Sequence, residues 1–334
     1  MRRFLAVLLL LLSAALLGCP LASPNTIEHG NVSFDVSPNG ETIVFSDANG
    51  DLWLFALLND KLTRLTESKE SESWPSFSPD GKSVIFVKDN ENGQGMSVYQ
   101  MIIDSREMQQ ITSSDQCSDS QPVFSPDGST IAFSRSHLRR RYSMGGWTWD
   151  KWDVYTIRLD GSDLTRQTHG NHYEIGGLAF SANAKHVYFT ADEIRNSDSK
   201  ATLFTITLDD SSVAATKPGK AGDYYAWCTD PHTNKKDEMV FISDRNSPFQ
   251  YDVVFAAPEG PQTTLGVTTV SQHNQNPVVT NDGRILFLAG TAWNSGSRPI
   301  FSLWSVNVDG TATKQLAGSA LFTNPLEWAR QQNH

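Results

Sequence analysis

Short hydrophobic runs separated by polar turns recur along most of the chain, and one tetrapeptide marks the period. Ser37-Pro38-Asn39-Gly40 is its first copy. The other copies, some degenerate, are Ser78–Gly81, Ser125–Gly128, Ser181–Ala184 and Thr280–Gly283. The first four begin at positions 37, 78, 125 and 181, so they lie 41, 47 and 56 residues apart. A further copy, around residues 228–236, keeps only the flanking pattern. This period predicts blade-sized repeats with loop insertions.

Each repeat predicts four short strands. Serine, proline and glycine at the first, second and last positions of the tetrapeptide favour a type I turn between the first two strands. Corresponding positions hold Phe34, Phe77, Phe124, Phe180, Trp227 and Val279 in the first strand, Phe45, Phe86, Phe133, Phe189, Phe241 and Phe287 in the second, and Trp53, Tyr99, Tyr155, Phe204, Val254 and Trp304 in the third. A short polar strand, such as residues 62–65 or 164–167, ends the unit. The pattern predicts an all-β fold, a six-bladed β-propeller of four-stranded antiparallel blades with these aromatic residues in its core.

The units of the form FSPDG…IxF…LY resemble the WD40-like repeat known as PD40, which occurs in the propeller domain of the periplasmic protein TolB. The resemblance extends over about residues 30–316. It implies a non-catalytic binding or scaffold role in the bacterial cell envelope. TolB also has an N-terminal α/β domain, whereas only a few residues separate Cys19 from the first repeat, so we expect a propeller without that domain.

The N-terminus predicts export. Met1-Arg2-Arg3 is basic, and the uncharged run that follows to Leu17 is shorter than the roughly 20 residues that span a bilayer. Leu16-Leu17-Gly18-Cys19 resembles a bacterial lipobox, in which the cysteine is lipidated. We therefore predict a signal peptide at 1–18, a tether at 19–29 and the propeller at 30–330, with a lipid anchor on Cys19. Ordinary cleavage after Ala22 is the alternative.

Composition narrows the range of partners. The chain has 334 residues, with 27 basic and 37 acidic side chains and a formal charge of −10. An acidic surface argues against nucleic acid, whose binders present basic patches to the phosphates. Cys117 and Cys228 fall in different repeats, so we expect unlinked thiols rather than a disulfide. We expect a monomer.

Strands that alternate in direction sort their connections onto two faces, and the long connections share one of them. The largest insertion, His137–Lys151, is rich in arginine and tryptophan, which often dominate binding energy at interfaces. The residues predicted to bind a ligand or partner on this face are Arg139, Arg140, Arg141, Trp147, Trp149, His169, His172, Tyr173, Tyr224, Arg245, His273, Trp293 and Arg298. A basic, aromatic surface suits an envelope protein or an anionic glycan. A loop packed on its own neighbours is the alternative.

Catalytic motifs are weak. The chain has no Gly-x-Ser-x-Gly elbow, and Cys117 and Cys228 have no supporting motif for a cysteine nucleophile. His169 and His172 lack an obvious third zinc ligand. Asp51, Asp153 and Asp252 recur before the third strand, where locking a turn is the alternative to binding a cation. We predict no cofactor and no metal. A polysaccharide lyase or a glycoside hydrolase acting on an anionic glycan at the long-loop face is the alternative function.

The C-terminal segment 324–328 (NPLEW) resembles the start of a blade at Trp74–Phe77. One interpretation is that this tail adds to the first blade and closes the ring, which removes exposed strand edges. A frayed tail is the other.

Overall fold

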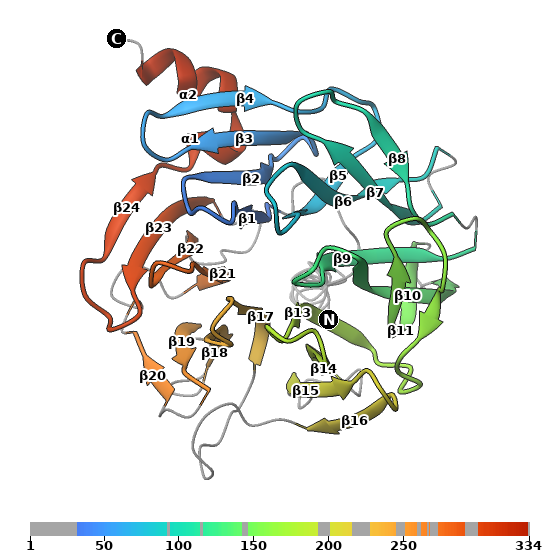
Figure 1. The fold of residues 1–334 in the computed structure, drawn as a ribbon. Helices are drawn as coiled ribbons and strands as arrows, with labels where there is room; N and C mark the ends of the chain where they lie inside the picture. Colours follow the sequence, from blue (N-terminus) through green and yellow to red (C-terminus); the bar gives the residue numbers. More distant parts are fainter. Residues whose placement is uncertain are drawn as a thin grey trace, which may run out of the picture.

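The chain forms six separate four-stranded antiparallel sheets arranged around a central axis (Figure 1). This computed structural model describes residues 32–91, 94–113, 116–141, 146–192, 201–215, 228–244, 251–258, 262–265, 267, 273–290 and 300–332. Within each sheet the strands follow one another in sequence order, from the innermost to the outermost. The predicted six-bladed propeller is therefore confirmed.

The blades are successive groups of four strands. Blades 1 to 3 contain β1 (Phe34–Val36), β2 (Thr42–Ser46), β3 (Leu52–Ala56), β4 (Lys61–Arg64), β5 (Glu72–Phe77), β6 (Ser83–Asp89), β7 (Met96–Ile102), β8 (Met108–Gln110), β9 (Ser118–Phe124), β10 (Thr130–Arg141), β11 (Trp147–Arg158) and β12 (Thr165–Arg166). Blades 4 to 6 contain β13 (Glu174–Phe180), β14 (His186–Asp192), β15 (Thr202–Thr207), β16 (Ser212–Ala215), β17 (Cys228–Thr233), β18 (Met239–Ser243), β19 (Asp252–Ala256), β20 (Gln262–Thr264), β21 (His273–Val279), β22 (Arg284–Gly290), β23 (Phe301–Asn307) and β24 (Lys314–Ala317).

The aromatic positions of the repeat form one layer of the core. In every blade the predicted residue of the second strand lies directly opposite that of the third. The pairs are Phe45 with Trp53, Phe86 with Tyr99, Phe133 with Tyr155, Phe189 with Phe204, Phe241 with Val254 and Phe287 with Trp304. All six phenylalanines are fully buried. Cross-strand neighbours on one face stabilise a sheet, so this layer supports each blade in the same way.

The tetrapeptides form the turns that their composition predicts. The Gly81 N–H donates to the Ser78 carbonyl at 2.8 Å, and the Ser78 hydroxyl donates to Asp80 Oδ1 at 2.6 Å. The same two bonds recur at Ser125–Gly128. Gly81 has a φ of +70°, which a glycine adopts without steric cost.

The first strand departs from the predicted alignment in two blades. Val36, rather than Phe34, precedes the turn of blade 1, and Thr233 precedes the turn of blade 5. Trp227 lies outside the described residues. The turn of blade 5 is Asn234–Asp237, which lacks the Ser-Pro-Asp-Gly tetrapeptide. Without the tetrapeptide, the sequence did not indicate where the first strand of this blade ends.

Ring closure joins blade 6 to blade 1 through a shared core. Phe34 and Phe45 pack in one cluster with Leu286 and Leu303. The Phe34 N–H donates to Asn276 Oδ1 at 3.0 Å. Closure therefore depends on burial of apolar surface between the two blades as well as on hydrogen bonds.

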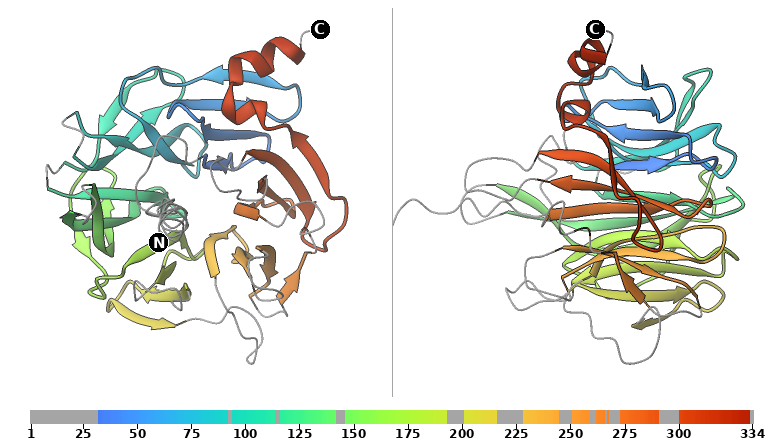
Figure 2. Two further views of the ribbon diagram at one scale, coloured as in Figure 1. Left: turned by 180° about the vertical axis from the view of Figure 1, so that it is seen from behind. Right: turned by 90° about the vertical axis from the view of Figure 1, so that its left-hand side faces the viewer.

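The C-terminal tail forms two short helices instead of a strand or a frayed end. Helices α1 (Ala320–Thr323) and α2 (Pro325–Gln332) lie on the outer rim against blade 1 (Figure 2). Phe322 meets Phe45 edge to face with ring centroids 5.1 Å apart, and Trp328 meets Phe55 in the same way. The tail thus reaches the predicted blade but covers it with helices.

Antiparallel order assigns the connections to two ends of the ring. We call the end with the first-to-second and third-to-fourth connections the turn end. The opposite end, with the second-to-third and blade-to-blade connections, is the loop end. The side view in Figure 2 shows the sheets spanning the molecule between these ends. Across the described ranges, no helix has the length and apolar character needed to cross a membrane.

Candidate functional site

The predicted insertion at the loop end of blade 3 is a β-hairpin. β10 and β11 each contain 12 residues, whereas the other strands contain at most 7. Their pairing continues from Thr130 opposite Arg158 to Arg141 opposite Trp147. The predicted long insertion is thus an extension of the β10–β11 ladder, interrupted at His137 and Lys151.

Two arginine contacts order the outer part of this hairpin. The Arg139 guanidinium lies over the Trp147 ring, 5.0 Å from its centroid. Arg140 Nη2 lies 3.0 Å from Asp150 Oδ2. Trp147 remains 50% exposed, and Arg141 is exposed as well. Trp149 is half-buried against the core of blades 3 and 4. The predicted arginines and Trp147 therefore lie together on one rigid element.

The base of the hairpin holds a chain of polar groups. His137 Nδ1 lies 2.8 Å from Cys117 Sγ, and His137 Nε2 lies 2.7 Å from the Tyr155 hydroxyl. Burial, followed by the charge of Arg135, lowers the pKa of His137. The imidazole is therefore neutral near pH 7, with one donor and one acceptor nitrogen. Cys117 is a free thiol, and no sequence motif indicates His137 as its partner.

A buried ion pair fixes the same region from below. Arg135 Nε and Nη2 donate to the two carboxylate oxygens of Asp119 at 2.6 and 2.8 Å. The Thr112 hydroxyl donates to Asp119 Oδ2 at 2.5 Å. Both charged side chains are nearly inaccessible. Because Thr112 follows blade 2 and Asp119 begins blade 3, the network also ties the two blades together.

The other predicted residues that the structure describes lie apart from the hairpin tip. His172 is buried against Phe189 and Phe204, and this position favours a packing role. His169 is exposed. Tyr173 is half-buried, and the His273 ring lies 5.6 Å from that of Tyr251.

Several predictions fall outside the described residues. They are the signal peptide, Cys19, Tyr224, Arg245, Trp293 and Arg298.

Two of the three recurring aspartates, Asp51 and Asp153, pair with arginines of the fourth strand. Asp51 Oδ2 lies 2.7 Å from Arg64 Nη2, and Asp153 Oδ2 lies 2.6 Å from Arg166 Nη2. Each of these aspartates thus pairs with a cation of its own blade. Asp153 Oδ1 also accepts a hydrogen bond from the Asn171 backbone N–H at 3.3 Å. No group of three acidic, histidine or cysteine side chains suited to a metal ion occurs among the residues that the structure describes.

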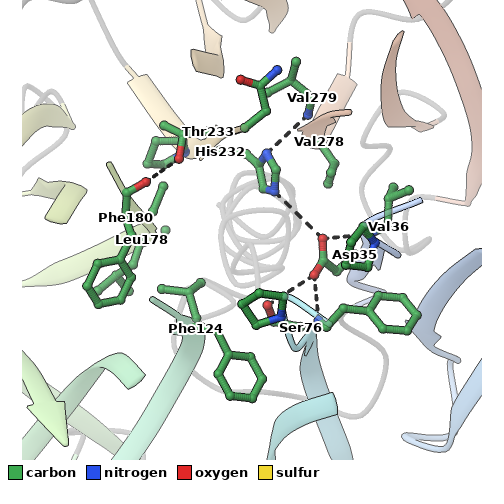
Figure 3. A pocket seen from close by; sticks show the side chains of 18 of the residues that line it. Asp35, Val36, Ser76, Phe124, Leu178, Phe180, His232, Thr233, Val278 and Val279 are labelled. Carbon is green, nitrogen blue, oxygen red and sulfur yellow. Dashed lines mark hydrogen bonds and ion pairs between the residues drawn. The ribbon is translucent and has the colours of Figure 1, made fainter. Parts of the chain in front are cut away.

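A central cavity of about 250 Å³ runs along the inner strands to the turn end. Prolines and small aliphatic residues form much of its wall. Figure 3 shows Asp35 and His232 pointing toward one another across the opening, while the rings of Phe124 and Phe180 point away from it. The cavity wall therefore combines apolar side chains with polar groups such as Asp35 and His232.

Side chains of this channel connect neighbouring blades. The inner strands belong to separate sheets, so their inward backbone groups need other partners. The Phe77 N–H donates to Asp35 Oδ2 at 2.8 Å, and the Val279 N–H donates to His232 Nδ1 at 3.3 Å. The Asn276 N–H donates to Asp230 Oδ2 at 3.0 Å. These polar residues interrupt the hydrophobic pattern because they bridge blades.

Inner-strand bulges bring these groups into place. Trp74, Gln121, Asp230 and Asn276 have φ values of 51–54°, and the register shifts beside each of them. At the matching position of blade 4, a Cβ on Gly177 would lie 2.9 Å from the Asp230 Cα. Glycine is required there because the next blade approaches too closely for a side chain.

Carboxyl groups crowd the loop end of blade 4. Glu174 lies directly opposite Asp192 in the β13–β14 ladder. Burial, reinforced by Asp192 and Asp230, raises the pKa of Glu174 to about 7. Burial also raises the pKa of Asp192. The sequence did not reveal this pair, because the two residues come from separate strands.

Comparison with known proteins confirms the resemblance found in the repeats. The family described as the TolB beta propeller domain matches residues 25–146. The crystal structure of TolB from Acinetobacter baumannii is 15% identical, with a TM-score of 0.61, over 86% of this chain and 63% of that one. This chain thus spans less than two thirds of that TolB. No curated protein matches the sequence.

Other solved structures share the propeller fold. An oligogalacturonate lyase from Vibrio parahaemolyticus is 14% identical, with a TM-score of 0.58, over 87% of this chain and 78% of that one. A puromycin-hydrolyzing peptidase from Mycobacterium tuberculosis is 15% identical, with a TM-score of 0.57, over 90% of this chain and 47% of that one. At such identities the likeness concerns the fold alone.

Proposed function

We propose that this chain is an exported, non-catalytic binding propeller of the bacterial cell envelope that engages a protein or an anionic glycan through the β10–β11 hairpin. The observation that carries the proposal is Trp147, half exposed and stacked on Arg139 near the tip of a regular hairpin. Tryptophan and arginine are the side chains most often found at energetic hot spots. A rigid element also loses little conformational freedom on binding.

The charge of the hairpin favours an anionic partner. Arg140 is paired with Asp150, whereas Arg139 and Arg141 present their charges beside an exposed aromatic ring. Such complementarity contributes mainly to the association rate and to specificity. Binding should therefore weaken as salt is added.

Affinity capture from envelope extract tests this proposal. The bait is the purified chain, compared with a variant carrying Arg139→Ala, Trp147→Ala and Arg141→Ala. Arg158→Ala is the matched control, because Arg158 is exposed at the turn end of the same blade. We expect the triple variant to lose partners that the control retains. Recovery of the same partners by both variants would overturn the role of the hairpin.

A carbohydrate-cleaving activity is the second candidate, and it rests on the Glu174–Asp192 pair. Two carboxyl groups, one of them protonated near neutral pH, are what acid–base cleavage of a glycoside requires. His137 and Tyr155 add a neutral base and a phenol at the same end. The test is incubation with anionic polysaccharides, followed by assay of new reducing ends and unsaturated products. Cleavage that disappears in Glu174→Gln or His137→Ala would replace the binding proposal with an enzyme.

The proposed location rests on the N-terminal sequence. Acylation of Cys19 would anchor the propeller to a membrane by lipid, in agreement with the lipobox-like run at residues 16–19. Intact-mass measurement of the mature protein tests this. An unmodified N-terminus at Ser23 would remove the anchor from the proposal and leave an exported protein.

A further inference from the structure

The central channel contains the carboxylate of Asp35, whose ion-pair neighbour is a histidine, His232. Asp35 accepts hydrogen bonds from the Val36 N–H at 2.7 Å, the Phe77 N–H at 2.8 Å and the Ser76 hydroxyl at 3.2 Å. These three donors fix the orientation of the carboxylate but carry no full positive charge. Over the described ranges, no lysine or arginine forms an ion pair with Asp35, and His232 Nε2 lies 3.9 Å away.

His232 does not supply the missing charge at neutral pH. Its Nδ1 accepts the Val279 N–H, so the proton of the neutral ring is on Nε2 and faces Asp35. Burial lowers the pKa of His232, and the charge of Asp35 acts against this only in part. The ring lies deep in the molecule, yet 32% of its side-chain surface is open to the channel.

Part of the wall around this carboxylate is apolar. The rings of Pro75, Pro231 and Pro277 and the side chain of Val278 contribute to the lining. Asp230 also lines the channel, but the Asn276 N–H and the Thr229 hydroxyl bind its carboxylate. Walls of low polarizability strengthen the field of a charge in a cleft relative to open water.

We propose that this channel binds a small alkylammonium ion, with the ammonium group against Asp35 and the alkyl chain along the proline and valine walls. Charge complementarity selects a cation, and the apolar wall selects one with a hydrocarbon body. The cavity of about 250 Å³ lies below the roughly 300–1,000 Å³ of pockets for drug-sized ligands, so the ligand is small. The site is separate from the hairpin of blade 3.

The pH dependence follows from the groups around the site. Burial raises the pKa of Asp35 above its ordinary value. Protons therefore compete with the ammonium ion for this carboxylate, and protonation of His232 adds a repelling charge on acidification. Burial raises the pKa of Asp230 to about 6, so acidification also removes the negative charge of this second carboxylate. Lys235, at the turn end of the channel, is exposed.

Titration of the purified chain with n-butylammonium, followed by calorimetry or ligand-detected NMR, tests the proposal. We expect saturable binding at pH 7.5 and at least a tenfold loss of affinity in Asp35→Asn. Asp80→Asn, which removes a carboxylate from the turn end outside the channel, should bind as the parent chain does. Absence of saturable binding, or equal binding by Asp35→Asn, would overturn the proposal.

A second comparison remains decisive if Asp35→Asn fails to fold. Butan-1-ol has nearly the shape of the probe and no charge, so the parent chain should bind it at least tenfold more weakly. Affinity for n-butylammonium should fall from pH 7.5 to pH 5, over which the amine keeps its charge. Equal affinity for the alcohol, or no change with pH, would overturn the proposal. The hairpin triple variant should bind the ammonium ion normally, so the two proposals fail independently.

Discussion

Carboxyl groups at the two ends of the propeller respond to their surroundings in opposite ways. At the turn end, the serine hydroxyl and a backbone N–H lower the pKa of Asp80 and of Asp127. At the loop end, burial raises the pKa of Glu174 and of Asp192. At the turn end, the same exposed hydrogen bonds within the turn recur in several blades. At the loop end, the buried carboxyl groups differ from blade to blade, and titratable groups with strongly shifted pKa values are often found at functional sites.

The largest difference between the ends should appear when their ion pairs are broken. Asp119→Asn leaves the buried Arg135 guanidinium without a countercharge, and we expect a loss of about 3–5 kcal/mol in the free energy of unfolding. Urea denaturation measures it. The matched change at the turn end of the same blade is Asp163→Asn, in an exposed pair with Arg158. It should cost less than about 1 kcal/mol, and equal losses would remove the distinction.

An intermediate effect is expected from Glu174. Its pKa in the folded chain is about 7, against an ordinary value of 4.5. The folded state thus holds a proton that the unfolded state releases, and stability falls as the pH rises from about 4.5 through 7. Glu174→Gln should remove this loss, stabilising the chain by about 1–3 kcal/mol at pH 8 and little at pH 4. Thermal unfolding at both pH values measures it, and an equal effect at both would contradict the assignment.

A smaller effect is expected from Asp127. The hydrogen bonds from Ser125 and Ser129 lower its pKa below 3.8, so its contribution is present above that value and is lost as the pH falls through the folded pKa. The side chain is largely exposed, and screening keeps the contribution below about 1 kcal/mol. Asp127→Asn should therefore have a small effect at pH 7 and a smaller one at pH 2. Chemical denaturation at both pH values provides the measurement. A larger effect at pH 2 would reverse the sign assigned to the turn end.

The hairpin should separate binding from stability. Trp147 is half exposed, so Trp147→Ala should change the free energy of unfolding by no more than about 0.5 kcal/mol. The same substitution should weaken partner binding at least tenfold. A loss of stability that accounts for the loss of binding would show that Trp147 is a packing residue. Capture and denaturation of the same preparation distinguish these outcomes.

The candidate sites were only partly accessible from the sequence. Arg139 and Trp147 fall in one predicted insertion because they are close along the chain, and their role in binding stays a prediction. His137 and Cys117 could not be paired in this way, since Cys117 precedes β9 whereas His137 lies in β10. Asp35 and His232 look like ordinary polar residues at the middle of an inner strand, and no local motif distinguishes them.

By itself the sequence determined the repeat, the turn chemistry and the opposition of Phe45 to Trp53 and its equivalents in the other blades. These follow from interactions within about 50 residues, and the period-2 pattern of a strand fixes which side chains meet. Only the tertiary structure decided that Asp35 faces His232 and that helices cover blade 1. Both contacts join parts of the chain that become neighbours when the ring closes, and closure depends on the summed packing of all six blades, which no local pattern encodes.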